Sequence, residues 1–388
     1  MSAPAFRVEM PGRKPGPLIR RLRLTDFRCY ASLDFASPAR LLALAGPNGA
    51  GKTNILEALS LFGPGRGLRR AQLTSMARKS GSGAFAIHAE GEGRLGDVAL
   101  GTAMQPGEPG RICRIDREPV PGANRFLDHL GLLWLTPDQD GLFRGSAGDR
   151  RRFLDRLVLA IDPDHASRAS AYENALRHRN RLLEDERADA QWLDAIEREI
   201  AEIGTALAAA RRETVIRLDA MGRADAAIIA PFPFAILRLE GDVEERLAQE
   251  KAGAVEDWFR AALRDNRWGD RQAGRTLIGP QASDLVVSHG PKGEEAVFCS
   301  TGEQKALLIG LILAQSRLIA QVRGEPPILL LDEIAAHLDE SRRAALFAML
   351  DGLGTQAFMT GTDRALFEAL PPGGLCCAVH DGKLEPLR

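Results

Sequence analysis

Residues 41–54 read LLALAGPNGAGKTN. Within this stretch, Gly46–Thr53 fits the phosphate-binding loop pattern G-x-x-x-x-G-K-[S/T] without a mismatch, between an apolar strand candidate and a helix candidate. In such a loop the backbone N–H groups point at phosphate oxygens, Lys52 reaches the β- and γ-phosphates, and the Thr53 hydroxyl ligates Mg²⁺. We therefore expect ATP and Mg²⁺ as cofactors. The candidate ATP-binding residues are Gly46, Pro47, Asn48, Gly49, Ala50, Gly51, Lys52, Thr53 and Asn54.

A pair of acidic residues follows a second apolar strand candidate, Ile328–Leu331. A fully apolar strand is typical of a buried parallel sheet, and α/β sheets bind ligands at the carboxyl ends of their strands. We expect Asp332 to hold Mg²⁺ through water, as the second metal-binding residue beside Thr53. We expect Glu333 to be the catalytic residue, acting as the general base that polarises the attacking water.

The segment Ser300-Thr301-Gly302-Glu303-Gln304 lies upstream of the acidic pair, at the start of an apolar helix candidate. Ser300 is placed as a helix N-cap, and a helix N-terminus is a ready anion site. A second phosphate-binding helix makes sense if it serves a different nucleotide, which is the logic of ABC-type ATPases, where two subunits sandwich two ATP molecules. Ser300, Gly302 and Glu303 are therefore candidate contacts to the nucleotide held by a second protomer.

Two residues near the C-terminus are candidates for a subunit interface or a switch. Asp339 follows Leu338 in a segment that resembles the loop crossing the dimer interface in ABC-type ATPases. Thr362 follows an apolar strand candidate, at the place where transporter ATPases usually carry a switch histidine. Because a neutral hydroxyl cannot do the proton or charge work of a histidine, we expect slow turnover.

The bulk composition is ordinary for a soluble globular protein of 388 residues, with 45% hydrophobic and 27% charged residues. The N-terminal segment has no apolar signal-peptide region, and no purely apolar run approaches the roughly 20 residues that span a bilayer. The five cysteines include no C-x-x-C pair. These features predict a cytoplasmic protein with no membrane partner.

The formal net charge of −1 means that any DNA-binding surface must be a local basic patch. Arginines cluster after the first helix candidate and again in a helical region, and such patches give salt-dependent, largely sequence-independent phosphate contacts. Since no aromatic residues are interleaved, duplex or junction backbone is the expected target. A role of these arginines in the fold or an interface is the alternative. The candidate DNA contacts are Arg69, Arg70, Arg150, Arg151, Arg152 and Arg179.

By pattern, the chain divides into a flexible tail at 1–17, an N-terminal part of the ATPase core at 18–145, a helical insertion at 146–274 and a C-terminal core part at 275–388. The insertion carries apolar residues at 3-4-3-4 spacing, the period of a coiled-coil seam. Two interpretations stay open, namely core helices of a bundle and a short antiparallel helical hairpin. The seam residues are Leu193, Ile196, Ile200, Ile203 and Leu207.

Two halves of one ATPase separated by a helical hairpin form a layout that resembles the SMC-like ATPases of chromosome maintenance. The expected fold class is therefore α/β: an ABC/SMC-head-type P-loop ATPase core, with a mixed sheet, flanking helices and an antiparallel β-lobe, and an inserted helical hairpin domain.

Four blocks outside the ATPase motifs resemble one family of this class, the RecF family. Their patterns in that family are L-x-L-x-x-F-R-N-Y, R-R-x-F-L-D, Y…R-N-x-L-L and T-x-x-G-P-H-R-D-D-L. Some positions depart from these patterns, among them Cys29, which replaces the usual Asn, and Gln281-Ala282, which replaces His-Arg. In the same order, the blocks are Leu22–Tyr30, Arg150–Asp155, Tyr172–Leu183 and Thr276–Leu285.

The resemblance implies a cytoplasmic DNA-repair protein that forms an ATP-dependent homodimer and binds duplex, gapped or junction DNA. It also implies that the protein helps RecO and RecR to place RecA on gapped DNA, with a part in the SOS response and in restarting replication. The alternative is an ABC-type ATPase that serves a membrane transporter or the ribosome. That alternative does not explain the helical insertion, the Phe27-Arg28 opening or Thr362.

Overall fold

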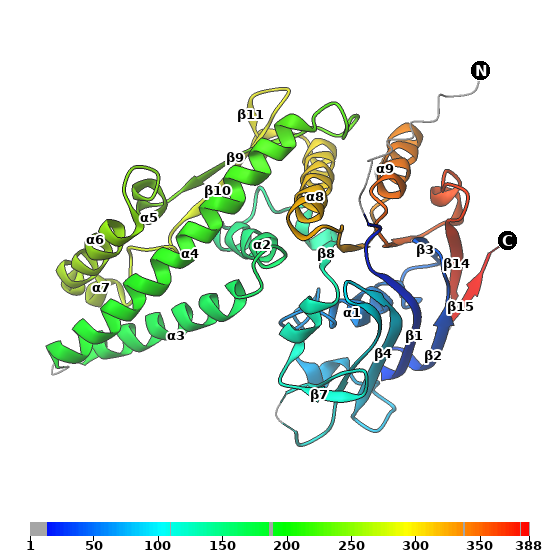
Figure 1. Ribbon diagram of the computed structural model, residues 1–388, viewed down its shortest axis with the longest axis horizontal. Helices are drawn as coiled ribbons and strands as arrows, with labels where there is room; N and C mark the ends of the chain where they lie inside the picture. Colours follow the sequence, from blue (N-terminus) through cyan, green and yellow to red (C-terminus); the bar gives the residue numbers. More distant parts are fainter. Residues whose placement is uncertain (1–13, 109, 186–188, 337, 381, 388) are drawn as a thin grey trace. The chain divides into compact units, whose positions relative to one another are not determined.

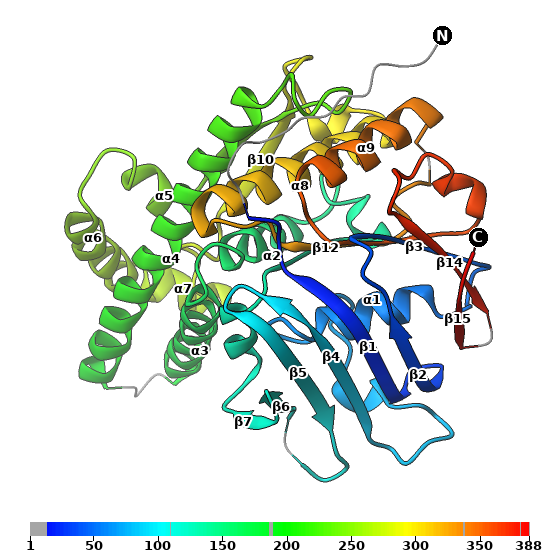
Figure 2. The same cartoon turned by 45° about the vertical axis from the view of Figure 1, so that its right-hand side comes forward.

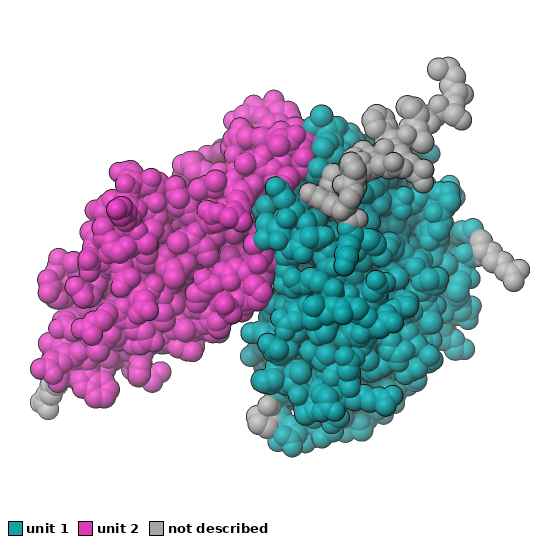
Figure 3. Space-filling view, in the orientation of Figure 1, with its two compact units in different colours: residues 1–140, 227–232, 308–388 teal, residues 141–226, 233–307 magenta. Residues whose placement is uncertain are grey.

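The computed structural model describes residues 14–108, 110–185, 189–336, 338–380 and 382–387. These residues belong to two compact units, coloured separately in Figure 3. The first unit comprises 1–140, 227–232 and 308–388, and the second comprises 141–226 and 233–307. The second unit thus includes 275–307, which the sequence pattern assigns to the C-terminal part of the core. Most of the expected tail, residues 1–13, lies outside the described residues.

A largely parallel six-stranded sheet forms the centre of the first unit (Figure 2). Its five parallel strands are short and apolar because helices cover both faces, and only its edge strand β15 runs antiparallel. In spatial order the strands are β15 (Lys383–Pro386), β14 (Leu375–His380), β3 (Leu41–Ala45), β13 (Ala357–Gly361), β12 (Ile328–Leu331) and β8 (Leu132–Leu135).

An antiparallel six-stranded sheet is the second layer of this unit, and it confirms the expected β-lobe. Buried residues alternate with more exposed ones along strands such as β5, as in a sheet with one face on a core. In spatial order the strands are β2 (Tyr30–Ala36), β1 (Leu18–Phe27), β4 (Phe85–Gly93), β5 (Gly96–Met104), β6 (Ile112–Ile115) and β7 (Glu118–Val120).

Helix α1 (Lys52–Ser60) shares one hydrophobic core with strands of both sheets. Ile328 and Leu330 of β12 belong to that core, whereas Leu329 and Leu331 line a small internal space with residues of α8 (Thr301–Arg323) and α9 (Glu340–Gly352). Alternate side chains of one apolar strand therefore face helices on opposite sides. This packing explains why the strand carries no polar residue.

The second unit is built on a helical hairpin of α3 (His165–Glu184) and α4 (Ala190–Ala224), which Figure 1 shows side by side. Leu193, Ile196, Ile200 and Leu207 are buried, as the seam spacing predicts. Ile196, Ile200 and Leu207 join a core that also holds Phe259 of α6 (Ala252–Asp265), so a third helix completes the hairpin and both sequence interpretations describe part of it. At Gly204 a Cβ would lie 2.7 Å from Tyr172 and 2.8 Å from Phe259, so only glycine allows this close packing.

Smaller elements complete the described residues. The second unit also has a three-stranded antiparallel sheet and three further helices, and short 3₁₀ helices join elements in both units. The helices are α2 (Ala147–Leu159), α5 (Asp242–Arg246) and α7 (Arg267–Ala273), the strands are β9 (Ala235–Glu240), β10 (Asp284–His289) and β11 (Glu294–Glu295), and the 3₁₀ helices are η1 (Leu73–Met76), η2 (Ala123–Asp128), η3 (Pro137–Gln139), η4 (Ala296–Phe298) and η5 (Arg364–Phe367).

Helix α8 is the one helix of the described residues that is long and apolar enough to cross a bilayer. However, 89% of its apolar window is buried inside the fold. Burial of this kind is typical of a core helix, which meets the same length and composition criteria, so α8 is weak evidence for a membrane span.

Candidate nucleotide site

The phosphate loop connects β3 to α1 and has the backbone conformation that its glycines permit. Gly49 and Gly51 have φ values of 85° and 107°, which side chains strongly disfavour. A Cβ on Gly51 would also lie 2.7 Å from the Cys29 Sγ and 2.8 Å from the Tyr30 Oη. No side chain of the described residues caps the N-terminus of α1, and the Asn54 N–H already donates to the Gly51 O at 3.0 Å, so an anion would bind at the N–H groups that precede it.

Lys52 is the lysine of the phosphate loop, and its side chain is buried, with 5% of the residue's surface exposed. Its Nζ donates hydrogen bonds to the carbonyl oxygens of Gly46, at 2.7 Å, and Pro47, at 2.9 Å. Burial lowers the pKa of Lys52 from its usual value, while the carboxylates of Glu333 and Asp332 partly oppose that shift. The ammonium group is therefore held at the loop by carbonyl oxygens that phosphate oxygens can replace as acceptors.

Thr53 and Asp332, the two expected Mg²⁺ ligands, are brought together although they are far apart in the sequence. The Thr53 Oγ1 donates a hydrogen bond of 2.9 Å to the Asp332 Oδ1. The described residues contain no group of three or more His, Cys, Asp or Glu that could hold a metal ion. One carboxylate and one hydroxyl nevertheless fit Mg²⁺, because this ion commonly takes few protein ligands and completes its shell with water and phosphate oxygens.

Glu333 follows Asp332 in an unusual backbone conformation. Its φ of 49° lies in the left-handed region, which is uncommon for a residue other than glycine. The backbone N–H of Glu333 donates to the Thr360 Oγ1 at 2.8 Å, and the same hydroxyl donates to the Asp332 Oδ1 at 2.6 Å. Sequence reasoning missed Thr360. The feature that could have indicated it is a single polar residue near the carboxyl end of an apolar strand, where α/β sheets bind their ligands.

The signature segment lies in the second unit, where it begins α8. Ser300 and Glu303 form a reciprocal cap: the Glu303 Oε2 accepts from the Ser300 N at 2.9 Å, and the Ser300 Oγ accepts from the Glu303 N at 3.4 Å. An ion pair with Lys292, together with the bonds from Ser300, lowers the pKa of Glu303 to about 2. Ser300 and Gly302 are exposed, so a ligand from outside the chain can approach them.

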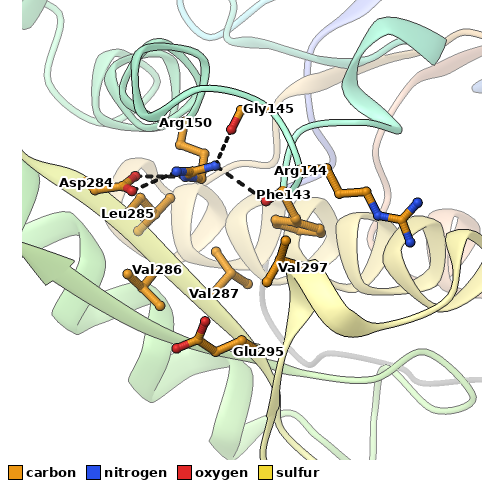
Figure 4. Close-up of a pocket in the computed structure, with 10 residues that line it drawn as sticks. All are labelled: Phe143, Arg144, Gly145, Arg150, Asp284, Leu285, Val286, Val287, Glu295 and Val297. Carbon is orange, nitrogen blue, oxygen red and sulfur yellow. Dashed lines mark hydrogen bonds and ion pairs between the residues drawn. The ribbon is translucent and has the colours of Figure 1, made fainter.

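A cavity of about 250 Å³ lies beside this segment within the second unit (Figure 4). Arg150, one of its lining residues, makes a two-pronged ion pair with Asp284, with both N–O distances at 2.7 Å, and also donates to the Gly145 O at 2.7 Å. Arg144 points elsewhere in Figure 4 and donates to the Cys299 O at 3.1 Å. The Arg150 side chain thus joins α2 to β10.

Asp339 and Thr362, the expected interface or switch residues, are both exposed in the first unit. The Asp339 Oδ1 accepts from the Arg342 N at 2.8 Å and so caps α9. Thr362 directly follows β13. Their exposure is compatible with a role in an interface, which stays a prediction.

Most of the arginines expected to contact DNA already have partners within the chain. Arg69 and Arg70 are exposed, and Arg69 donates to the Asn54 Oδ1 at 2.9 Å. Arg152 is exposed and pairs with Asp149, whereas the half-buried Arg151 donates to a backbone oxygen of Ser283. Arg69, Arg70 and Arg152 therefore remain the most accessible candidates.

Arg179 requires a correction, because the prediction that it contacts DNA is wrong. Its exposed fraction is 0%. The guanidinium donates to the Glu197 Oε1 at 3.0 Å and to the Asp270 Oδ2 at 2.7 Å. It also donates at 2.7 Å to the Thr276 Oγ1 and to the Leu263 O. All three nitrogens of the guanidinium therefore donate hydrogen bonds inside the second unit, and the side chain connects α3 to α4, α6 and α7.

Two departures from the family pattern also have local partners. Gln281 accepts from the Tyr172 hydroxyl at 2.5 Å and donates to the Ile278 O at 2.9 Å. Cys29 accepts from the Asn54 Nδ2 at 3.2 Å, beside the phosphate loop. These side chains therefore have structural roles at the positions where the family pattern has His and Asn.

Comparison with known proteins shows close relatives across nearly the whole chain. The AAA domain family matches residues 21–94. The DNA replication and repair protein RecF of Brucella abortus (strain 2308) is 55% identical over 368 residues, which cover 94% of this chain and 95% of that protein. The protein of the same name from Rhizobium etli (strain CIAT 652) is 50% identical over 94% of this chain and 98% of its own length.

Solved structures share the architecture at lower identity. One is the recombination mediator protein RecF with ATPrS in the RecFOR pathway, with a TM-score of 0.84, 19% identity and coverage of 97% of this chain and 99% of that one. Another is the Smc head domain with an extended coiled coil from Pyrococcus furiosus, with a TM-score of 0.54, 15% identity and coverage of 96% of each chain. At these identities the likeness shows the fold alone.

This architecture has the fold of SMC-like ABC-type ATPase heads. Relatives that share half or more of their residues with nearly the whole chain narrow the class further. The chain belongs to the RecF family of DNA replication and repair proteins. Membership of this family leaves the alternative of a transporter or ribosome ATPase without support.

Proposed function

We propose that this protein is an ATP-gated DNA clamp in which ATP joins two protomers, DNA binds to the dimer and slow hydrolysis releases it. The observation that carries the proposal is the hydrogen bond between Thr53 and Asp332, which connects the phosphate loop to the acidic pair. The solved relatives named RecF-ATPrS and RecF-ATP support ATP as the nucleotide.

In this proposal the residues of the chain bind the nucleotide, orient it and move one proton. Lys52 and the backbone N–H groups of the loop hold the phosphates, and Thr53 and Asp332 hold Mg²⁺. When bound, Mg²⁺ would neutralise charge on the phosphate oxygens. Glu333 accepts a proton from the attacking water, and it acts as the catalytic residue. Thr362, at the place of a switch histidine, keeps turnover slow.

The second protomer supplies the remaining contacts. Ser300, Gly302 and Glu303 of one protomer face the nucleotide of the other, and Asp339 lies at the interface between them. The exposed N-terminal turn of α8 supports this assignment, because its N–H groups and helix dipole favour an anion. Because each ATP contacts both protomers, ATP binding causes dimerisation, and the rate of hydrolysis sets the lifetime of the dimer.

In this proposal the protein contacts the phosphate backbone of DNA and does not recognise a base sequence. The most accessible candidate contacts are Arg69 and Arg70 in the first unit and Arg152 in the second, and Arg150 and Arg151 add charge from their paired positions. Neutralising phosphates in this way gives affinity that falls steeply as salt rises. Duplex, gapped or junction DNA is therefore the proposed ligand, and DNA binding stimulates hydrolysis.

The biological setting follows from the family. The protein would act in the cytoplasm with RecO and RecR to place RecA on gapped DNA, and it would contribute to the SOS response and to replication restart. The solved relative described as a recombination mediator in the RecFOR pathway supports this setting.

Sedimentation velocity of the wild type and of Glu333→Gln, with ATP and Mg²⁺, tests the clamp. A duplex that carries a single-stranded gap is added in a second series at low and moderate salt. We expect a dimer only with ATP, a longer-lived dimer in Glu333→Gln with hydrolysis reduced at least about a hundredfold, and salt-sensitive DNA binding by that dimer.

Glu368→Gln is the matched control, because Glu368 is an exposed carboxylate of the same unit outside the candidate site. It should hydrolyse ATP and dimerise as the wild type does. A protein that stays monomeric with ATP and ignores DNA would rule out the clamp. A dimer that hydrolyses ATP equally well with Glu333→Gln would remove Glu333 from the catalytic role.

A further inference from the structure

Thr360 connects the two acidic residues of the candidate site and has no role in the family motifs considered above. It lies in β13, next to β12, and the parallel register pairs Leu331 with Met359, one residue before Asp332 and Thr360. The Thr360 side chain is completely buried, with 0% exposed. Its hydroxyl accepts from the Glu333 N and donates to the Asp332 Oδ1, so both of its hydrogen-bonding functions are used at this site.

We propose that Thr360 is a positioning residue for ATP hydrolysis, which fixes the directions of the Asp332 and Glu333 side chains. The proposal rests on the function proposed above. Glu333 has a φ of 49°, a conformation that costs a non-glycine residue free energy and persists only where its surroundings hold it. The hydrogen bond of 2.8 Å from its N–H to the buried hydroxyl is one such support.

The same hydroxyl restricts Asp332. The Asp332 Oδ1 accepts one hydrogen bond from Thr360, at 2.6 Å, and one from Thr53, at 2.9 Å. Two donors on one carboxylate oxygen, from two different elements, fix the rotation of that carboxylate. Thr360 therefore couples the phosphate loop, the proposed metal ligand and the backbone of the proposed general base.

Among buried side chains of this size, only a hydroxyl can donate one hydrogen bond and accept another. Valine has nearly the shape of threonine but makes neither bond, so Thr360→Val leaves the Glu333 N–H and one lone pair of Asp332 without their partner. Serine keeps the hydroxyl and loses one methyl group. The pair of variants therefore separates the hydrogen bonds from the packing.

Thr355, which lies just before β13 begins, offers a matched control. It is also completely buried, and its hydroxyl donates to the backbone oxygen of Pro327, before β12 begins. Thr355→Val removes a buried hydroxyl of the same kind but touches neither acidic residue. Any effect of hydroxyl loss on stability alone should therefore appear in both valine variants.

The experiment measures steady-state hydrolysis, affinity for a fluorescent non-hydrolysable ATP analogue and thermal unfolding for all three variants and the wild type. We expect Thr360→Val to lower kcat about tenfold to a hundredfold, because small displacements of reacting groups have effects of this size. Analogue affinity should stay within about threefold of wild type. Thr360→Ser should recover most of kcat, and Thr355→Val should lower only the unfolding temperature. A crystal structure of Thr360→Val should show Glu333 relaxed from its positive φ.

Wild-type kcat in Thr360→Val, or an equal loss of kcat in Thr355→Val, would overturn the proposal. A Thr360→Val protein that loses kcat while Glu333 keeps its positive φ would also overturn it. Failure of the proposed function is a separate outcome, since it would appear in the wild type as absent hydrolysis or in Glu333→Gln as unchanged hydrolysis.

Discussion

At the scale of single residues, Arg179 shows that the surroundings of a side chain decide its role. Arg179 belongs to an arginine-rich stretch, and charge alone suggested a DNA contact. In the fold it is fully buried with Glu197 and Asp270, both themselves only 1% exposed. Such a charge is stable only because its partners neutralise it and accept its hydrogen bonds. The arginine therefore serves the fold of the helical unit.

Replacing Arg179 by alanine should destabilise the helical unit strongly. The variant leaves the carboxylate of Asp270 buried without its guanidinium, and breaking one side of a buried ion pair costs about 3–5 kcal/mol. Urea unfolding followed by circular dichroism measures this loss. The control is Arg181→Ala, which removes an exposed arginine from the same helix and should change the free energy of unfolding by less than about 0.5 kcal/mol. Equal stability of the two variants would contradict the structural role of Arg179.

At the scale of elements, the start of α8 is a rigid and open helix end. Ser300 and Glu303 cap each other, while Arg144 and Gln304 donate to the carbonyl of Cys299 just before the cap. At Gly302 a Cβ would meet no heavy atom within 4 Å. The turn is therefore held in place by its own side chains and has room for a ligand on its outer face.

Gly302→Asp should separate the fold of α8 from its proposed ligand. A carboxylate in the first turn interacts favourably with the helix dipole, so the thermal unfolding temperature should stay the same or rise slightly. The same charge repels a triphosphate, so ATP-dependent dimerisation in sedimentation should be lost. Gly253→Asp is the matched control, because Gly253 occupies the equivalent position in α6 and also has no atom within 4 Å of a Cβ. Normal dimerisation of Gly302→Asp would contradict the contact between signature and nucleotide.

At the scale of the whole molecule, the candidate residues are divided between the two units. The phosphate loop and the acidic pair belong to the first unit, and the signature residues belong to the second. In a two-fold sandwich, each nucleotide would be held by the first unit of one protomer and the second unit of its partner. Each of the two sites would then depend on both chains.

Mixing two inactive variants tests this arrangement. Lys52→Ala disables the phosphate loop and Gly302→Asp disables the signature, so each variant alone should show little hydrolysis. In a mixed dimer one site combines both defects and the other combines both intact halves. Because Gly302→Asp should not dimerise with itself and each mixed dimer holds one intact site of two, an equimolar mixture should recover up to about half of the wild-type rate per protomer. Absence of recovery, with mixed dimers shown by a tag, would contradict sites shared between protomers.

The short-range features of this protein could be predicted because neighbouring residues determine them. Gly49 and Gly51 allow the positive φ angles of the phosphate loop, and their spacing to Lys52 is enough to identify it. Ser300 and Glu303 are three residues apart, so their reciprocal cap is also a local property. The fold class followed because the order of these motifs along the chain is typical of one kind of ATPase head.

Tertiary structure alone decided the features that depend on contacts between distant residues. Thr360 acquired its place beside Asp332 and Glu333 from the parallel register of β12 and β13. Arg179 became buried because α3 and the segments holding Asp270 and Thr276 fold around it. Hydrophobic pattern predicts that a strand or helix exists, but it does not state which elements pack against it. The sequence by itself therefore determined the phosphate loop, the helix cap and the class, whereas long-range packing decided which polar residues build the site and which stabilise the fold.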